Sequence, residues 1–395
     1  MPLNSAAKQY LTITLSYWAF TLTDGALRML VLFFFHSLGY TPIELASLFI
    51  LYEVFGILTN LYGGWLATRI GVTRCLHIGL GLQILALGML AVDNSVLNLA
   101  YVMIAQAISG IAKDLNKMSA KSSIKLLVKD DQQTKLYCWV ALLTGSKNSL
   151  KGLGFFLGGF LMTTLGFANS LQALMALLAV TLILSLLFLK PQTTSYKPKF
   201  TETLSKSRDI NLLSVARFFL FGSRDIWFVV ALPVFLQSQL LWTHLEVGGF
   251  MACWIIGYGL VQGFAPQIIG SNSQQTPRGT VLTSWSARLV FIPAVIAAGL
   301  IFELDPAIIL VTGLLVYGAI FAINSSIHSY LIVAFSKRDS VSADVGFYYM
   351  ANAAGRLAGT LLSGFVYQQY GLVACLAISS LMVITSTILS AKISP

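Results

Sequence analysis

Long apolar stretches, separated by short polar ones, run through the whole 395-residue chain. Each is about 20 residues long, the length that an α-helix needs to cross the hydrocarbon core of a bilayer. Because lipid cannot hydrogen-bond a peptide backbone, such stretches are expected to be helical. The pattern predicts twelve membrane-spanning helices, at residues 10–36, 43–68, 75–92, 97–120, 136–163, 168–189, 211–236, 245–268, 280–302, 307–335, 342–368 and 371–392.

One polar stretch, between Lys190 and Ile210, is longer than the others and divides the spans six and six. We therefore predict an N-terminal half at 1–190, a cytoplasmic linker at 191–210 and a C-terminal half at 211–395. The halves also repeat weakly. A shift of 205 residues superposes Lys151, Gly154, Gly159 and Gly166 on Arg356, Gly359, Gly364 and Gly371. Two related six-helix halves predict an all-α membrane protein that works by alternating access, with its site between the halves.

The composition supports membrane insertion and fixes an orientation. Hydrophobic residues make up 56% of the chain, charged residues 10%, and the mean hydropathy is +0.79. Sixteen of the 25 Lys and Arg residues fall at positions that are cytoplasmic if the N-terminus is inside, and the outside loops hold none. This asymmetry predicts a multi-pass protein of the inner (plasma) membrane with both termini cytoplasmic. It also explains the pI near 9.4 without nucleic acid as a partner.

The other nine basic residues lie within the predicted spans, where only four acids accompany them. A charge in hydrocarbon costs roughly 3 kcal/mol or more, so intramembrane charges tend to face a polar cavity and mark a substrate path. The excess of bases predicts an anionic small-molecule substrate. Arg288 is an exception, because it belongs to a span expected at the outside of the bundle, from which it can extend to the interface.

Several of these bases share a helix face. Lys113 and Lys117 are four residues apart, as are Lys147 and Lys151, and such pairs lie on one side of a helix. Lys151 and its repeat equivalent Arg356 are expected to approach the cavity from opposite halves and to hold a doubly anionic cargo between them. The predicted substrate-binding residues are Arg28, Lys113, Lys117, Lys147, Lys151, Arg217, Arg224 and Arg356, with Asn116, Asn148, Asn324, Asn352 and Tyr348 as neutral hydrogen-bonding groups.

Four other residues could couple transport to protons: Asp24, Glu53, Asp225 and His328. Each has a structural alternative. Asp24 can pair with Arg28 within its own helix, and a buried histidine is more often a packing residue. Asp114 is expected to turn away from Lys113 and Lys117 and to pair with another helix. The four cysteines and four histidines are scattered, so we predict no metal site and no cofactor.

The stretch after the second span reads GGWLATRIGVTR and resembles the signature of the major facilitator superfamily. It departs from that signature at Thr68, where the family has an acid that helps to close the cytoplasmic gate. Gly154, Gly158 and Gly159 have the spacing of the family's antiporter glycine motif, but Phe155 replaces its proline. Close helix packing through small residues explains these glycines equally well.

A narrower resemblance covers essentially the whole chain. Its residues are YWAFTLTDGALRML (17–30), GIAKDLNKMSAKSSIK (110–125), GSKNSLKGLGFFLGG (145–159) and RFFLFGSRDIWFVVALPVFL (217–236). These are similar to the ArsJ-type organoarsenical efflux permeases. The resemblance implies export of 1-arseno-3-phosphoglycerate, which a companion glyceraldehyde-phosphate dehydrogenase makes from arsenate, and hence arsenate resistance. It implies no residue-level site assignments.

Two other functions compete with this one. The first is a proton-coupled or exchange transporter of another organic phosphate or of a drug, although a drug pump would need fewer buried bases. The second is a membrane-embedded enzyme or receptor. The chain has neither a zinc-binding HExxH nor a Gly-x-Ser-x-Gly elbow, so we expect it not to be an enzyme. We further expect it to be a monomer in the lipid bilayer.

Overall fold

A computed structural model describes residues 5–40, 47–129, 131–192, 207–242, 244–270 and 277–393, and within these ranges it contains helices and no strand. A short 3₁₀ turn, η1 (Asn94–Val96), precedes α5. The α-helices are α1 (Ser5–Ser37), α3 (Ile50–Ile70), α4 (Val72–Leu90), α5 (Leu99–Leu127), α6 (Gln133–Phe188), α7 (Arg208–Phe228), α8 (Ala231–Ser238), α9 (His244–Ile268), α10 (Gly279–Ile301), α11 (Pro306–Phe335) and α12 (Val341–Ser390).

Two of these helices, α6 and α12, each contain two predicted spans. The chain leaves helical geometry at Gly166 in α6, with φ 73°, and at Gly371 in α12, with φ 74°. Glycine adopts this left-handed region without the steric penalty that other residues meet. The two glycines are 205 residues apart, so the repeat read from the sequence places the same break in both halves.

Among the described residues, eight helices are long and apolar enough to cross a membrane, and α6 and α12 are among them. The predicted second and fourth spans correspond to α3 and α5, which are 21 and 29 residues long and are not among these eight. The predicted seventh span continues from α7 into α8. With the two arms of α6 and α12 counted separately, the helices correspond to the twelve predicted spans. The prediction of an all-α membrane protein is confirmed.

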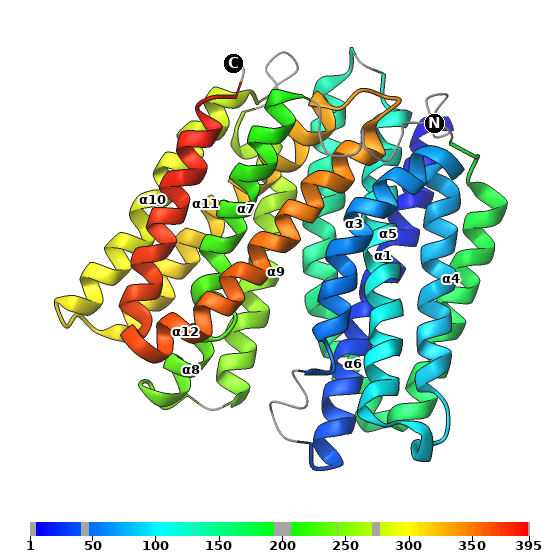
Figure 1. Ribbon diagram of the computed structural model, residues 1–395, viewed down its shortest axis with the longest axis horizontal. Helices are drawn as coiled ribbons and strands as arrows, with labels where there is room; N and C mark the ends of the chain where they lie inside the picture. The colour runs from blue at the N-terminus through cyan, green and yellow to red at the C-terminus, as the bar shows by residue number, and fades with distance from the viewer. Residues whose placement is uncertain are drawn as a thin grey trace. The chain divides into compact units, whose positions relative to one another are not determined.

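The described helices fall into two compact units. The first contains α1, α3, α4, α5, most of α6 and the start of α12, and the second contains α7 to α11, the start of α6 and most of α12 (Figure 1). The short segments 133–145 and 336–350 therefore belong by their contacts to the unit opposite to their place in the sequence. The predicted division at 190 and 211 remains a prediction, and most of the predicted linker, residues 193–206, lies outside the described residues.

In the first unit, α5 packs along both α3 and α4 (Figure 1). Glycines permit the close approach. A Cβ on Gly110 of α5 would overlap the backbone of Tyr52 in α3, and a Cβ on Gly79 of α4 would overlap the amide of Asn116. The start of α12 packs on α3 in a similar way, since a Cβ on Gly64 would lie 2.6 Å from the carbonyl oxygen of Ser342. This packing places polar residues of α3 beside those of α5.

In the second unit, α11 packs against α9 and α10 around an aromatic core. Trp227 contacts Trp254 and Tyr317 edge to face, with ring centroids 6.1 and 5.1 Å apart. Tyr258 and Phe321 continue the cluster, with centroids 5.8 Å apart. Rigid aromatic packing of this kind fixes the helices on which the charged residues of this unit lie.

Candidate functional site

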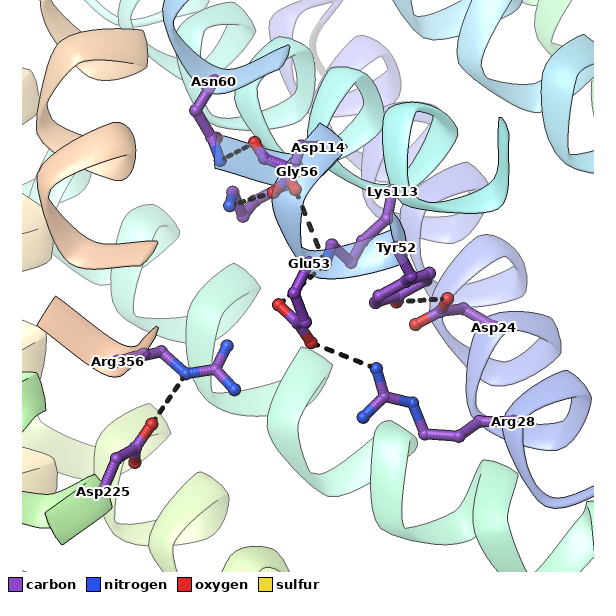
Figure 2. A network of polar contacts seen from close by, with 11 residues as sticks. Asp24, Arg28, Tyr52, Glu53, Gly56, Asn60, Lys113, Asp114, Asp225 and Arg356 are labelled. Carbon is purple, nitrogen blue, oxygen red and sulfur yellow. Dashed lines mark hydrogen bonds and ion pairs between the residues drawn. The ribbon is translucent and has the colours of Figure 1, made fainter. Parts of the chain in front are cut away.

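Arg28 of α1 and Lys113 of α5 meet at the carboxylate of Glu53 in α3 (Figure 2). The Arg28 Nη2 atom lies 3.2 Å from Glu53 Oε1, and the Lys113 Nζ atom lies 3.8 Å from Oε2. The side chains of Arg28 and Glu53 are 28% and 36% exposed, and that of Lys113 is 20% exposed. Three helices thus bring two cations to one partly exposed acid.

Tyr52 contacts both cations of this group. Its ring centroid lies 4.8 Å from the Arg28 guanidinium carbon and 3.9 Å from Lys113 Nζ, within the range of cation–π attraction. Its hydroxyl donates a hydrogen bond of 2.7 Å to Asp24 Oδ1 (Figure 2). The acid that the sequence paired with Arg28 is therefore held by a tyrosine, and Arg28 instead pairs with Glu53.

Asp114 follows Lys113 in α5 and is buried, with its side chain 2% exposed. It forms an ion pair with Lys117 and lies 3.5 Å from Lys113 Nζ. The expectation that Asp114 pairs with another helix is wrong, because the spacing of one and three residues keeps its carboxylate next to these lysines of its own helix. Lys117 and Lys121 also contact the ring of Tyr349, and Lys121 donates a hydrogen bond of 2.9 Å to its hydroxyl.

In the second unit, Asp225 of α7 is held by two arginines. Arg224 Nε donates to Asp225 Oδ1 at 2.6 Å, and Arg356 of α12 donates to Oδ2 at 3.1 Å (Figure 2). The Asp225 side chain is fully buried, whereas that of Arg356 is 37% exposed. One acid thus partly neutralises two predicted substrate ligands.

Arg217 forms a second polar group in this unit, one helical turn before Phe221. Its Nε donates to Asn352 Oδ1 at 2.8 Å, and its Nη1 donates to Ser325 Oγ at 2.9 Å. Ser325 also accepts a bond of 3.2 Å from Gln262. The guanidinium carbon lies 3.8 Å from the centroid of Phe221. Arg217 is buried, so these neutral contacts compensate part of the cost of placing its charge there.

Lys147, Asn148 and Lys151 lie on α6 and are partly buried. The Lys151 ammonium is 5.8 Å from the ring of Phe155, and its backbone carbonyl lies against Gly25 of α1, where an added Cβ would be 3.0 Å away. The backbone of α6 at Lys151 therefore packs closely against α1. The predicted clamp with Arg356 joins the two units, and it remains a prediction.

The remaining predicted ligands are buried. Asn116 donates to the carbonyl of Ala112 at 2.9 Å, and Asn324 donates to Ser286 Oγ of α10 at 2.6 Å. Tyr348 packs edge to face on its neighbour Tyr349. His328 is fully buried, and neither of its ring nitrogens has a hydrogen-bond partner among the described residues.

Arg288 lies outside these groups. Arg288 is exposed on α10, with its guanidinium carbon 4.7 Å from the centroid of Trp285. Among the residues that the structure describes, no three His, Cys, Asp or Glu side chains are placed to hold a metal ion.

The sequence did not single out Phe221 and Tyr52 as aromatic partners of the cations. Phe221 contacts both Arg217 and Arg224, and their spacings of four and three residues within one helix could have indicated it. Tyr52 could not have been found in this way, because its contacts come from α1 and α5.

Formal charges are distributed unevenly over these groups. In the first, the acids Asp24, Glu53 and Asp114 accompany the cations Arg28, Lys113, Lys117 and Lys121. In the second, Asp225 pairs with Arg224 and Arg356, while Arg217 has the neutral partners Asn352 and Ser325. Cations therefore outnumber acids in both groups, and Lys147 and Lys151 of α6 add two further positive charges. Such an excess can attract an anion and still be solvated by hydrogen bonds and aromatic faces when no anion is bound.

Comparisons with known proteins agree with this architecture. Residues 13–327 match the model of the Major Facilitator Superfamily. Three solved structures are similar over almost the whole length of both chains: the human organic anion transporter MFSD10 (TM-score 0.72, 17% identity, 98% of each chain), the fucose:proton symporter FucP of E. coli (TM-score 0.78, 12% identity, 99% of this chain and 100% of that one) and a bacterial homologue of the iron transporter ferroportin (TM-score 0.77, 12% identity, 99% of each chain). At these identities the likeness concerns the fold alone. No curated protein matches the chain.

Proposed function

The chain belongs to the major facilitator superfamily, and on this premise we propose that it exports an anionic organoarsenical, 1-arseno-3-phosphoglycerate. It is a multi-pass membrane transporter and not an enzyme. The substrate and the direction of transport are our proposal, and they follow the resemblance of the chain to the ArsJ-type permeases.

The excess of positive charge is the observation that carries the proposal. In the second unit, Arg224 and Arg356 share one buried acid and Arg217 is buried among neutral partners, and α6 adds two partly buried lysines. A cargo with a phosphate at one end and an arsenate at the other matches that excess. An arginine binds such tetrahedral groups as a planar fork, and a lysine binds them as a mobile point charge. One solved structure of similar fold is described as an organic anion transporter, which agrees with this substrate class.

Within this proposal, Lys151 and Arg356 bind the two ends of the cargo, and Arg217 with Asn352 provides a further anion contact. A companion glyceraldehyde-phosphate dehydrogenase supplies the cargo, so the transporter confers arsenate resistance only together with it. The protein acts as a monomer in the inner membrane with both termini in the cytoplasm, an orientation supported by the distribution of Lys and Arg.

Inside-out membrane vesicles provide the test. Vesicles containing the transporter are given glyceraldehyde 3-phosphate, NAD, the dehydrogenase and arsenate, so that the labile cargo forms at the cytoplasmic face. We expect arsenic to accumulate inside only when all components and the transporter are present. Arsenate or 3-phosphoglycerate alone should accumulate much less. Equal accumulation without the dehydrogenase would contradict the proposed cargo.

The same vesicles separate this proposal from a proton-coupled transporter. An anion leaving a negative cell interior gains about 2.3 kcal/mol per charge per 100 mV. We expect a potential set with potassium and valinomycin to change the rate at fixed pH. A rate that follows the pH gradient and ignores the potential would favour the proton-coupled alternative, with Asp24, Glu53, Asp225 and His328 as candidate proton carriers.

A further inference from the structure

Glu53 differs in exposure from the other acids deep in the spans. Its side chain is 36% exposed, whereas those of Asp114 and Asp225 are 2% and 0% exposed. Asp24 is also buried and is engaged by Tyr52. Charged side chains within membrane spans face polar cavities rather than lipid. Of these acids, Glu53 is therefore the one whose ion pairs an anion in such a cavity can reach.

The ion pairs of Glu53 with Arg28 and Lys113 are long for charge-assisted hydrogen bonds. Its two oxygens lie 3.2 Å from Arg28 and 3.8 Å from Lys113, whereas such bonds are ordinarily about 2.7–2.9 Å. The buried Asp225 lies 2.6 Å from Arg224 Nε, within the short range. The spacing between the two oxygens of a carboxylate is fixed. Glu53 therefore bridges Arg28 and Lys113 without lying in close contact with both.

The two cations are held by another group as well. The Tyr52 ring faces both, at 4.8 Å from the Arg28 guanidinium carbon and 3.9 Å from Lys113 Nζ. Lys113 also lies 3.5 Å from Asp114. Arg28 and Lys113 therefore keep their positions when Glu53 moves away, and a site that is organised before binding costs its ligand less ordering entropy.

From these observations we propose that Glu53 is an internal counter-ion that the cargo displaces. In the empty transporter, its carboxylate takes the position at Arg28 and Lys113 that one anionic group of the cargo occupies on binding. A phosphate or arsenate group, with three terminal oxygens that share up to two negative charges, can approach both cations more closely than one carboxylate. The inference rests on the proposed function, because it requires an organic anion as cargo.

This role makes a prediction opposite to that of an ordinary binding residue. Removing the charge of Glu53 removes a competitor, so Glu53→Gln should bind anions more tightly. Equilibrium binding of radiolabelled 3-phosphoglycerate to the purified full-length protein measures this. We expect the Kd of Glu53→Gln to fall about three- to tenfold, the range for the loss of a partly exposed ion pair. Arg28→Gln and Lys113→Gln should raise the Kd about tenfold or more.

Glu303→Gln is the matched control, since it removes the same charge from an exposed position beyond the end of α10 and should leave the Kd unchanged. Glu53→Asp is a second variant for the case that Glu53→Gln does not fold. It keeps the charge but is one methylene shorter, so it should tighten binding by a smaller factor.

The outcomes separate this inference from the function on which it rests. If the wild type binds 3-phosphoglycerate and Glu53→Gln binds it equally or more weakly, the counter-ion role is rejected and the proposed function stands. If neither protein binds 3-phosphoglycerate or inorganic phosphate, and vesicles carrying the wild type accumulate no arsenic, both are rejected. If Glu53→Gln and Glu303→Gln both bind more tightly, the effect comes from the net charge of the protein, and the inference is rejected.

Discussion

Asp225 is held by two arginines that differ in burial. The Arg224 side chain is 14% exposed and contacts Asp225 with two nitrogens, at 2.5 and 2.6 Å. The Arg356 side chain is 37% exposed, and its Nε lies 3.1 Å from Asp225 Oδ2. A buried charge that loses its partner destabilises a protein far more than an exposed one does. Asp225 and Arg224 are therefore structural partners, and under the proposed function Arg356 is the arginine expected to contact the cargo.

Neutralising these residues one at a time should give opposite phenotypes. We expect Asp225→Asn to lose about 3 kcal/mol of stability, because Arg224 is left buried without its carboxylate. Arg356→Gln should lose less than about 1 kcal/mol but should slow export roughly tenfold or more, since it removes a charge-assisted contact to the cargo. Thermal unfolding in detergent and arsenic uptake by vesicles measure the two effects. Full export by Arg356→Gln would exclude it as a cargo ligand.

At the scale of helices, paired glycines set two crossings. A Cβ on Gly154 of α6 would lie 2.6 Å from the carbonyl oxygen of Leu22 in α1, and 3.1 Å from the Cα of Gly25. A Cβ on Gly359 of α12 would likewise lie 2.6 Å from the carbonyl oxygen of Gly222 in α7. Gly154 and Gly359 are equivalent in the repeat. The glycine motif of α6 therefore brings two helix backbones together, as expected for small residues at membrane helix interfaces.

Alanine substitutions in α12 test this packing. We expect Gly359→Ala to destabilise the protein by about 1–3 kcal/mol, because its methyl group would meet backbone atoms that cannot rotate away. Gly364→Ala lies five residues further along the same helix, where a Cβ has no neighbour within 4 Å. It should be neutral or slightly stabilising, since alanine favours helix over glycine. Thermal unfolding compares the variants, and equal losses would argue against the backbone crossing.

For the whole molecule, the connections between helices carry the signal for orientation. The connections around η1 and after α8 contain no Lys or Arg. By contrast, Arg69 and Arg74 flank the connection after α3, and the connections after α5 and α11 contain Lys129 and the pair Lys337 and Arg338, respectively. Basic residues are retained on the cytoplasmic side during insertion. The proposed direction of export depends on this orientation, because the cargo forms in the cytoplasm and must be carried to the other side of the membrane.

Cysteine labelling in whole cells tests the orientation. In a variant from which the native cysteines, including the exposed Cys253, have been removed, new cysteines replace Asn94, Gln239 or Asp131, all of which are exposed. We expect a membrane-impermeant thiol reagent to label positions 94 and 239 from outside, and position 131 only after the membrane is opened. The reverse pattern would overturn the orientation and the direction of transport.

The sequence by itself determined the elements of this protein. Apolar length specified the spans, because a helix is the way for an isolated segment to satisfy its backbone in lipid. The 205-residue repeat placed Gly166 and Gly371 at equivalent breaks, where φ is 73° and 74°. The excess of buried bases over acids was also visible, since it is a count that needs no geometry.

Only the tertiary structure decided which charges meet. Spacing within α1 suggested that Asp24 pairs with Arg28, but Arg28 pairs with Glu53 from α3 and Asp24 binds the hydroxyl of Tyr52. A long side chain on one helix can reach several neighbours, and the choice depends on how closely the backbones pack. Here Gly110 lets α5 approach α3 at Tyr52, and that contact places a tyrosine ring and a carboxylate between cations that lie 85 residues apart in the sequence.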